Sequence, residues 1–376
     1  MEVVTSSSRA DDAERDIVHM SRALDLAQMG WGQTSPNPMV GAVICVDGRN
    51  VGEGYHAALA EPHAEVMAIR AAGERARGAT LYVSLEPCNH HGRTPPCSGA
   101  IIAAGITRVV AAVSDPNPHA AGGAARLREA GVSVEVGLLE TEARELNAAF
   151  FHSFQADIPF VTIKLATSLD GAISDAKRTR RWITSEQSRA EVHRIRAVND
   201  AIAVGLQTAI ADDPRLTART NPPPRVPPVR IVFDRHARLN PASVLARSAR
   251  ETPVLLVTAV NAPMRPQLAS IGVEAIAAHD LNDALRQLRR RGITSVLVEG
   301  GAGLVASFLA NGTVDRLVIF QAPVILGNGS LGAFSGVAAQ EVSHAPRFKL
   351  LRTRSIGDDV MSLYSVDRRK HVHGTD

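Results

Sequence analysis

The sequence has few aromatic residues, few cysteines and no long apolar run. Tryptophan, tyrosine and phenylalanine make up 4% of the 376 residues, too few for the base-stacking surfaces of proteins that bind single-stranded nucleic acid. No apolar run approaches the length of a membrane span, and residues 1–15 lack the apolar core of a signal peptide. The formal net charge is only +3, with acidic and basic residues interspersed. We therefore expect neither a nucleic-acid partner nor a membrane partner.

The cysteine count and the length indicate the cellular setting and the number of domains. Three cysteines do not make a disulfide framework, which favours a reducing, cytoplasmic location. One of them, Cys45, lies in an apolar, strand-like run and is expected in a core. A chain of 376 residues exceeds the roughly 250–300 residues at which a single core stops growing. We therefore expect two domains.

The first half alternates between strand and helix patterns. Residues 1–14 are expected to be disordered, and apolar spacing predicts a helix over 16–30. Strands are predicted at 40–46, 51–56, 80–84, 108–113 and 133–137. Helices are predicted from 63 to 73, from 97 to 104 and from 140 to 154. This alternation with short turns indicates a layered α/β domain over residues 15–155.

A second α/β pattern follows a short linker at 156–160. Strands are predicted at 160–165, 201–204, 229–233, 254–257, 295–298 and 317–321, with helices between several of them. The two halves share no internal repeat, so residues 161–367 are expected to form a different domain. Residues 368–376 are expected to be a disordered tail.

A possible zinc site is formed by His63-Ala64-Glu65, Pro87-Cys88 and Cys97. Taken singly, these residues would be ordinary buried thiols and a helix-start histidine. Together, His63, Cys88 and Cys97 offer three ligands and leave a fourth position for water, the pattern of catalytic zinc. Glu65 is then free to move protons. The spacing is close to the zinc deaminase signature, although the interval between the cysteines is longer than the usual two residues.

Polar residues near these ligands are candidates for substrate binding. Asn37 lies between two prolines, and this stiff segment either presents its amide to a heterocycle or forms a simple turn. His90 and Arg93 lie in the insertion between the cysteines. They are further ligands, an anion-binding group or solvated loop residues, and we favour the anion-binding group.

These motifs resemble the deaminase half of the bifunctional riboflavin-biosynthesis deaminase/reductase family. The similar segments are Pro36-Asn37-Pro38-Met39-Val40-Gly41, His63-Ala64-Glu65, Asp115-Pro116-Asn117-Pro118 and the stretch from Pro87 to Cys97 with its Gly-Arg-Thr-Pro-Pro loop. The resemblance implies a cytidine-deaminase-like three-layer domain. It also implies zinc at His63, Cys88 and Cys97, with Glu65 as the proton shuttle.

The second half contains a glycine-rich turn after the strand predicted at 295–298. Residues 301–306 match the G-x-G-x-x-A dinucleotide pattern, but a close-packed turn would give the same letters. The acidic residue expected about 20 positions on is absent. The turn is more informative in combination with other motifs of this half. Together they resemble the reductase half of the same family: Lys164, Ser168-Leu169-Asp170-Gly171, Trp182-Ile183-Thr184-Ser185, Asp212-Asp213-Pro214 and Glu299-Gly300-Gly301.

By this resemblance the second domain has a dihydrofolate-reductase-like α/β fold and uses NADPH. Lys164 is the expected catalytic cation. The expected cofactor contacts are Thr167, Trp182, Thr208, Asp212, Gly301, Ala302, Gly303, Leu304, Val305, Ala306 and Ser307. The expected substrate contacts are Asn37, His90 and Arg93 in the first domain and Arg180, Arg196, Leu216, Arg219 and Glu299 in the second. Asp212 contacts either cofactor or substrate, and Arg235 either holds the 2′-phosphate of NADPH or is an exposed loop residue.

The resemblance implies two steps of riboflavin biosynthesis on phosphorylated pyrimidines. The first is zinc-dependent hydrolytic deamination and the second is NADPH-dependent reduction of the ribosyl group. A homo-oligomer, a dimer or higher, through the second domain is expected on the same ground. One alternative is a nucleic-acid deaminase, which would need a basic groove with interleaved aromatics. The other is a structural zinc module with a nucleotide-sensing domain, which would need a fourth protein ligand.

Overall fold

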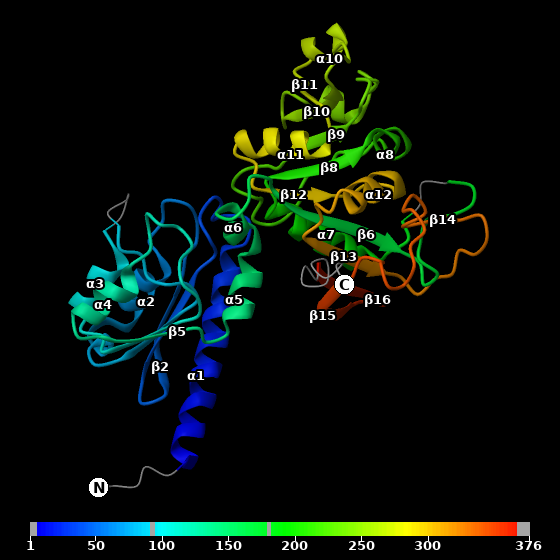
Figure 1. Ribbon diagram of the computed structural model, residues 1–376. Helices are drawn as coiled ribbons and strands as arrows, with labels where there is room; N and C mark the ends of the chain where they lie inside the picture. Colours follow the sequence, from blue (N-terminus) through cyan, green and yellow to red (C-terminus); the bar gives the residue numbers. More distant parts are fainter. Residues whose placement is uncertain (1–5, 91–94, 179–181, 367–376) are drawn as a thin grey trace, which may run out of the picture. The chain divides into compact units, whose positions relative to one another are not determined.

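The computed structural model describes residues 6–90, 95–178 and 182–366, with side chains from residue 12 on. The chain divides into two compact units, Met1–Gln155 and Ala156–Asp376, which are described separately (Figure 1). The division falls where the predicted linker begins. The expected tail, 368–376, lies outside the described residues.

The first unit is built on a five-stranded sheet. Its order is β2 (Arg49–Tyr55), β1 (Gly41–Val46), β3 (Thr80–Val83), β4 (Arg108–Ala111) and β5 (Ser133–Val136). Strand β1 is antiparallel to both of its neighbours, whereas β3, β4 and β5 run parallel. The carboxyl ends of β3 and β4 therefore lie side by side, and both lead into the functional site described below.

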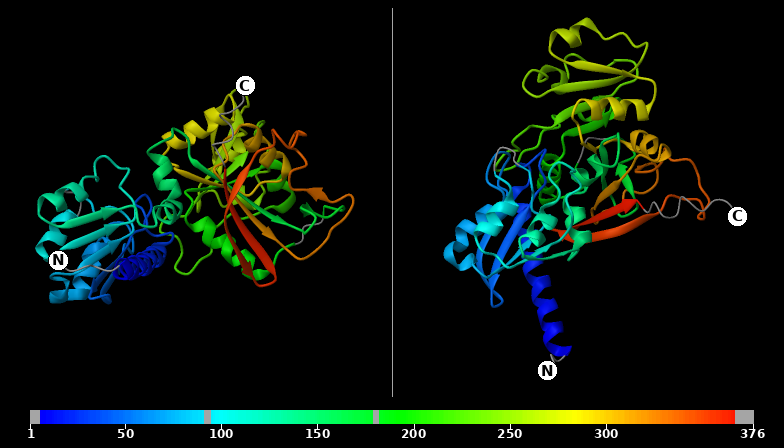
Figure 2. Two further views of the ribbon diagram at one scale, coloured as in Figure 1. Left: turned by 60° about the horizontal axis from the view of Figure 1, so that its bottom comes forward. Right: turned by 60° about the vertical axis from the view of Figure 1, so that its left-hand side comes forward.

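Helices cover both faces of this sheet, as Figure 2 shows. Ala42 and Ile44 of β1 share a core with α2 (Ala64–Ala72), α3 (Cys97–Ala103) and α4 (Gly123–Glu129). Val43 and Cys45 share the opposite core with α1 (Ser6–Ala27), α5 (Glu140–Leu146) and α6 (Ala148–Ser153). Alternate residues of one strand thus enter opposite cores. The predicted three-layer domain is confirmed.

Two local predictions in this unit are wrong, and one helix was not predicted. Helix α1 begins at Ser6, so residues 6–14, expected to be disordered, form its first turns. No glycine or proline interrupts this segment, and Asp16 fixes the helix to the sheet through Tyr82 and Arg108, both at 2.5 Å. The helix predicted over 140–154 is broken at Asn147, and α4 was not predicted. Short 3-10 turns, Gln28–Gly30 and Gly73–Ala76, end α1 and α2.

The second unit is built on a nine-stranded sheet. Its order is β11 (Glu274–Ala278), β10 (Val254–Ala259), β9 (Val229–Phe233), β8 (Ala201–Gly205), β12 (Ser295–Val298), β6 (Phe160–Thr167), β13 (Arg316–Gln321), β16 (Asp359–Val366) and β15 (Phe348–Ile356). The first seven strands are parallel. Strand β16 is antiparallel to both of its neighbours, β13 and β15, so β15 runs in the same direction as the first seven. Strands β7 (Ala172–Ser174) and β14 (Leu331–Gly332) form a small separate sheet.

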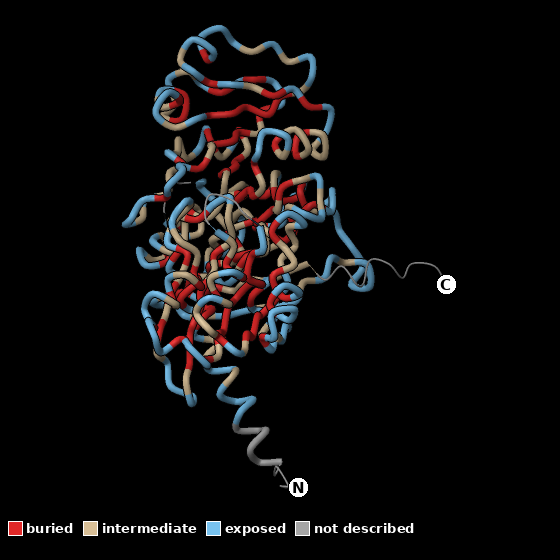
Figure 3. Tube along the Cα trace, turned by 90° about the vertical axis from the view of Figure 1, so that its left-hand side faces the viewer, coloured by how far each residue is buried: buried red, intermediate tan, exposed pale blue. Residues whose placement is uncertain are grey.

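The helices of this unit are α7 (Glu186–Ala197), α8 (Leu206–Asp212), α9 (Val244–Arg247), α10 (Pro266–Ser270), α11 (Leu281–Arg290) and α12 (Ala302–Ala310). Ile163 of β6 packs in one core with α11 and α12, and Ile202 of β8 packs in another with α8 and α9. Figure 3 shows the buried positions along the strands. Within the described residues, no helix is long and apolar enough to cross a membrane.

The strand order brings three carboxyl ends together. Strand β12 lies between β8 and β6 and is parallel to both. In open α/β sheets, ligands bind outside the carboxyl ends of neighbouring parallel strands. The ends of these three strands and the segments that follow them carry the predicted reductase residues.

Candidate active sites

The three predicted zinc ligands meet at the ends of two helices. His63 precedes the first residue of α2, Cys97 is the first residue of α3, and Cys88 follows β3. Nδ1 of His63 lies 3.6 Å from Sγ of Cys88 and 3.3 Å from Sγ of Cys97, and all three atoms lie within 4.8 Å of one another. Tetrahedral zinc, with bonds of about 2.0 Å to nitrogen and 2.3 Å to sulfur, needs separations of roughly 3.5 Å. The three side chains therefore fit a zinc ion.

The two thiols lie close enough to share a proton. Their mutual hydrogen bond lowers the pKa of Cys88 to about 4 and raises the pKa of Cys97, so without a cation one thiol holds the proton. A dication at this point favours the thiolate form of both, because it offsets the repulsion between them. The donor set is thus suited to a metal that binds thiolate.

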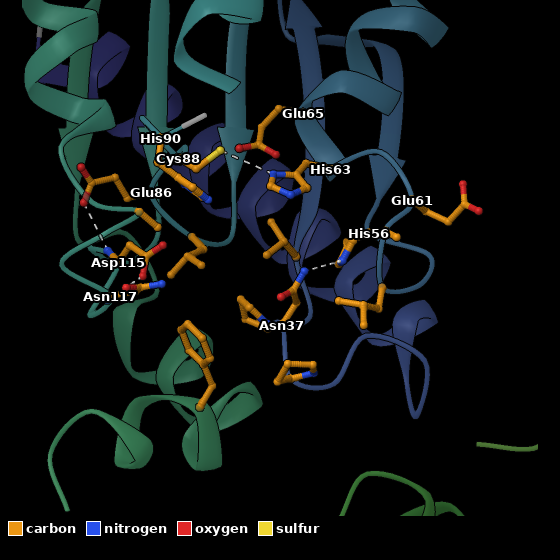
Figure 4. Close-up of a pocket in the computed structure, with 18 residues that line it drawn as sticks. Asn37, His56, Glu61, His63, Glu65, Glu86, Cys88, His90, Asp115 and Asn117 are labelled. Atoms are coloured by element: carbon orange, nitrogen blue, oxygen red, sulfur yellow. Dashed lines mark hydrogen bonds between the residues drawn. The ribbon is translucent and has the colours of Figure 1, made fainter. Parts of the chain in front are cut away.

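Glu65 lies in the first turn of α2, beside these ligands. Its side chain is only 3% exposed, and in Figure 4 its carboxylate points toward Cys88 and His63. Burial raises the pKa of Glu65 to about 7, and the nearby Cys88 adds to the effect. A carboxyl group with a pKa near neutrality can both accept and release a proton at neutral pH.

A pocket of about 450 Å³ opens at these residues (Figure 4). Its volume lies within the range of roughly 300–1,000 Å³ found for small-molecule sites. The lining combines apolar side chains with polar ones: Pro36, Asn37, Pro38, Val40, His56, Leu59, Ala60, Glu61, His63, Glu65, Leu85, Glu86, Cys88, His90, Asp115, Asn117, Ala120 and Phe150.

Asn37 and His56 form a pair on the pocket wall. Nδ2 of Asn37 lies 3.3 Å from Nε2 of His56, and Nδ1 of His56 lies 3.3 Å from the carbonyl oxygen of Pro62. A carbonyl only accepts, so Nδ1 of His56 carries the proton and Nε2 accepts from the Asn37 amide. Burial lowers the pKa of His56, which favours this neutral form. The pair therefore fixes which way the Asn37 amide faces.

Glu86 connects the opposite wall of the pocket to the segment that carries the zinc ligand Cys88. Its carboxylate accepts three backbone N–H groups, at 3.0–3.2 Å, from the segment that follows β4 and carries Asp115. At Gly123 of the same segment, an added Cβ would lie 1.7 Å from the carbonyl oxygen of Pro87, the residue before Cys88. The wall and the ligand segment are thus packed directly against each other.

Some of the residues that line this pocket were predicted from the sequence. The structure places Asn37 and His90 on its lining, whereas Arg93 lies outside the described residues. His56, Glu86 and Phe150 also line the pocket without having been predicted, and Asp115 and Asn117 line it without having been given a role. Asp115 and Asn117 lie in a segment that already resembled the family, which was a usable signal. His56 is a lone histidine at a strand end, and nothing in its spacing marks it.

The second unit brings Lys164, Arg196 and Glu299 together. Glu299 directly follows β12, whose last residue pairs with Ile163 of β6, so Glu299 lies beside Lys164. Oε2 of Glu299 lies 3.8 Å from Nζ of Lys164, and the carboxylate accepts two hydrogen bonds from Arg196, at 2.5 and 3.0 Å. Residues more than 130 positions apart in sequence thus form one charged cluster.

The charges in this cluster oppose the effect of burial. Burial raises the pKa of Glu299, but the neighbouring Arg196 and Lys164 outweigh it and bring the pKa to about 2. Burial lowers the pKa of Lys164, while the charge of Glu299 acts in the other direction. Glu299 is therefore a carboxylate at neutral pH, and it favours the protonated form of Lys164.

The glycine-rich turn lies at the same end of the sheet. Gly301 precedes α12, and its N–H donates to the hydroxyl of Thr208 in α8 at 3.0 Å. Asp212, the last residue of α8, acts electrostatically on Lys164. The predicted cofactor residues Thr208 and Gly301 are thus in contact, and the turn begins a helix as expected.

Other predicted residues have different surroundings. Trp182 is 74% exposed, with the Arg189 guanidinium 5.2 Å from its ring centroid. Leu216 is buried in a left-handed conformation (φ 51°), and Arg219 donates to Nε2 of His193. Arg180 lies outside the described residues. Thr167 is buried at the end of β6, and residues 302–307 form the first turns of α12.

Each of the two sites lies in a part of the chain that matches a known protein family. Residues 13–113 match the cytidine and deoxycytidylate deaminase zinc-binding region, and residues 159–362 match the RibD C-terminal domain. The riboflavin biosynthesis protein RibD of Aquifex aeolicus is 42% identical over 354 residues, covering 93% of this chain and 98% of that protein. The chain belongs to the RibD family.

Further RibD proteins agree in sequence and structure. RibD of Escherichia coli is 41% identical, with 92% of this chain and 98% of that protein covered. The structure of Acinetobacter baumannii RibD covers 95% of this chain and 100% of its own, at 36% identity and a TM-score of 0.81. The deaminase/reductase from Thermotoga maritima covers 94% and 99%, at 36% identity and a TM-score of 0.82.

As a RibD protein, the chain joins a zinc-dependent deaminase to an NADPH-dependent reductase of riboflavin biosynthesis. This matches the two enzyme activities that the sequence predicts. The predicted cytidine-deaminase-like and reductase domains are confirmed as well. The individual contacts predicted for cofactor and substrate stay predictions.

Removing zinc should separate the two activities. Dialysis against a chelator is expected to abolish ammonia release, because His63, Cys88 and Cys97 belong to the first unit only. NADPH oxidation with an already deaminated substrate should persist. Parallel assays before and after re-addition of zinc measure both. Loss of both activities, restored together by zinc, would contradict this assignment.

Proposed function

We propose that this chain deaminates 2,5-diamino-6-(5-phosphoribosylamino)pyrimidin-4-one and then reduces the ribosyl group of the product. The final product would be 5-amino-6-(5-phosphoribitylamino)uracil. The Thermotoga maritima protein is described as a deaminase and reductase with these substrates, and this chain is similar to it over nearly its full length.

The observation that carries the proposal is the buried Glu65 beside three converging zinc ligands. A structural zinc site would use a fourth protein ligand and would have no need of a buried carboxyl group in a pocket. Within the described residues, the ligand cluster contains His63, Cys88 and Cys97 and no fourth residue. This arrangement favours catalysis over a structural role.

In the deamination, Glu65 would carry the protons. His63, Cys88 and Cys97 would hold the zinc, which would supply water acidic enough for attack at neutral pH, with a pKa of about 7 in place of 15.7. Glu65 would accept a proton from that water and deliver it to the ring nitrogen and then to the departing ammonia. One C–O bond forms and one C–N bond breaks, so water is consumed and ammonia released. Asn37, oriented by His56, would hold the edge of the pyrimidine.

In the reduction, Lys164 would supply the cation beside the reacting carbon. NADPH supplies the hydride for C1 of the opened ribosyl group. Lys164 would stabilise the charge that develops on the oxygen or nitrogen bonded to C1 and donate the proton that completes the reduction, and Glu299 would favour its protonated form. Arg196 would fix Glu299 through its two hydrogen bonds. Thr208 and the Gly301 turn would contact the cofactor, where a helix N-terminus favours phosphate. Leu216, Arg219 and Arg196 would line the substrate.

Both steps can be followed in one cuvette. Purified, zinc-loaded protein is mixed with the diaminopyrimidinone, and ammonia is measured before NADPH is added. We expect ammonia first and a loss of NADPH absorbance afterwards. Ammonia without oxidation would contradict the roles of Lys164 and Glu299. Absence of ammonia from zinc-replete protein would contradict the whole proposal.

Two further predictions concern the whole protein. A homo-oligomer through the second unit and a cytoplasmic location are expected from the sequence. In support of the first, edge strand β15 has an exposed Leu350, and an unpaired sheet edge can add a strand from another copy. Light scattering over a dilution series would measure the oligomeric state.

A further inference from the structure

Asn147 interrupts a helix at the deaminase pocket. Helix α5 ends at Leu146 and α6 begins at Ala148, with Asn147 at φ −114° and ψ 30° between them. Its backbone N–H still donates to Ala143 and its carbonyl accepts from Phe151. The backbone of Asn147 thus keeps a helical hydrogen bond on each side of the bend, and its side chain is available for a contact elsewhere.

That side chain binds the backbone of a distant residue, Met39. Oδ1 of Asn147 accepts from the Met39 N–H at 2.8 Å, and Nδ2 donates to the Met39 carbonyl at 2.8 Å. Asn147 is only 7% exposed, so water cannot readily replace either bond. Two bonds to one residue fix both the position and the direction of its backbone, as a neighbouring strand would.

Met39 follows the segment that carries Asn37. Pro36 and Pro38 have no N–H, so Met39 provides the first backbone donor after Asn37 itself. The Asn37 N–H donates to Thr34 on the other side. The Asn147 amide holds Met39 directly, and the backbone N–H of His56 donates to the next residue, Val40, at 2.9 Å. Phe150, one turn after Asn147, lines the same pocket.

The geometry points to Asn147 as a positioning residue of the deaminase site. It holds Met39 so that the Asn37 amide, paired with His56, meets the pyrimidine edge. This inference rests on the proposed deamination and adds to it a residue 108 positions away that sets substrate affinity. Asparagine suits the position because it offers one donor and one acceptor on a short side chain.

The test compares Asn147→Asp and Asn147→Leu with the wild-type chain. Aspartate keeps the size and the acceptor, but its second oxygen faces the Met39 carbonyl. Leucine removes both hydrogen bonds. We expect KM for the diaminopyrimidinone to rise about tenfold or more, because small displacements of a binding group are costly. The kcat should stay within about threefold, since the zinc ligands and Glu65 are untouched. A wild-type KM in both variants would overturn the inference.

Leu146→Ala is the matched control, because Leu146 is the adjacent residue and packs against the core that contains Ala143 and Phe151, without bonding Met39. It should destabilise the unit and leave KM unchanged. Zinc content and reductase rate on deaminated substrate report folding in every variant. If Leu146→Ala raised KM as much as Asn147→Leu does, the effect of Asn147 would be one of packing alone. That result would overturn the inference.

A double-variant cycle tests whether Asn147 acts through Asn37. In an Asn37→Ala background, adding Asn147→Asp should change KM by no more than about twofold, because the group it positions is gone. Full additivity of the two effects would overturn the inference, even if Asn147→Leu does not fold. Absence of ammonia release from the wild-type protein would instead contradict the proposed function itself.

Discussion

Glu65→Gln is expected to lower the rate of ammonia release by about 100- to 10,000-fold, the contribution typical of a positioned acid–base group. Glutamine has the same shape and cannot accept the proton from water. Burial already raises the pKa of Glu65 to about 7, so a neutral amide at this point should cost little stability. Zinc content and thermal unfolding should therefore be close to wild type. Ammonia release under substrate saturation measures the effect.

Glu74→Gln is the matched control, an exposed glutamate in the turn that follows α2. It should leave ammonia release unchanged. NADPH oxidation on deaminated substrate should be unaffected in both variants. If Glu65→Gln kept more than about a tenth of the wild-type rate, another group would have to move the proton and the mechanism above would be wrong.

Lys164→Met is expected to lower NADPH oxidation by about 100- to 1,000-fold, the usual result of removing one preorganised electrostatic group. Methionine fills the space of the lysine stem without its charge. Glu299 keeps its two hydrogen bonds to Arg196, so its carboxylate is not left without a charged partner. The unit should therefore fold, and ammonia release from the first unit should not change.

Lys349→Met on the exposed edge strand β15 serves as the control for loss of a lysine. Stopped-flow or steady-state NADPH absorbance distinguishes the two variants. A Lys164→Met protein that oxidises NADPH within about fivefold of wild type would show that the charge on Lys164 is not needed in the reduction.

The zinc ligands could be predicted because their signal is local. His63 and Glu65 are two positions apart, and each cysteine stands at a recognisable strand end or helix start. The Lys164–Glu299 contact has no such signal. It depends on β12 being inserted between β8 and β6, and only the resemblance to a family placed these residues in one site.

Two physical causes account for the errors in the predicted elements: a tertiary contact and an exposed sheet edge. The apolar pattern over 140–154 is helical, and the break at Asn147 arises from a contact with Met39 that spacing cannot reveal. The β15–β16 hairpin was missed because exposed charged residues such as Lys349 and Arg352 obscure its alternation. At an edge strand, polar side chains are tolerated and the strand pattern weakens.

The Glu86 contacts have a consequence for engineering. A library meant to redirect the deaminase to other amino-heterocycles would vary pocket positions such as His90 and Asn117, whose side chains are not used to hold the zinc ligands. Glu86 and Gly123 would be kept constant, because a side chain at 123 has no room beside Pro87 and would displace Cys88. The pocket thus contains positions that a library can vary and positions that must stay constant because they hold the zinc ligands in place.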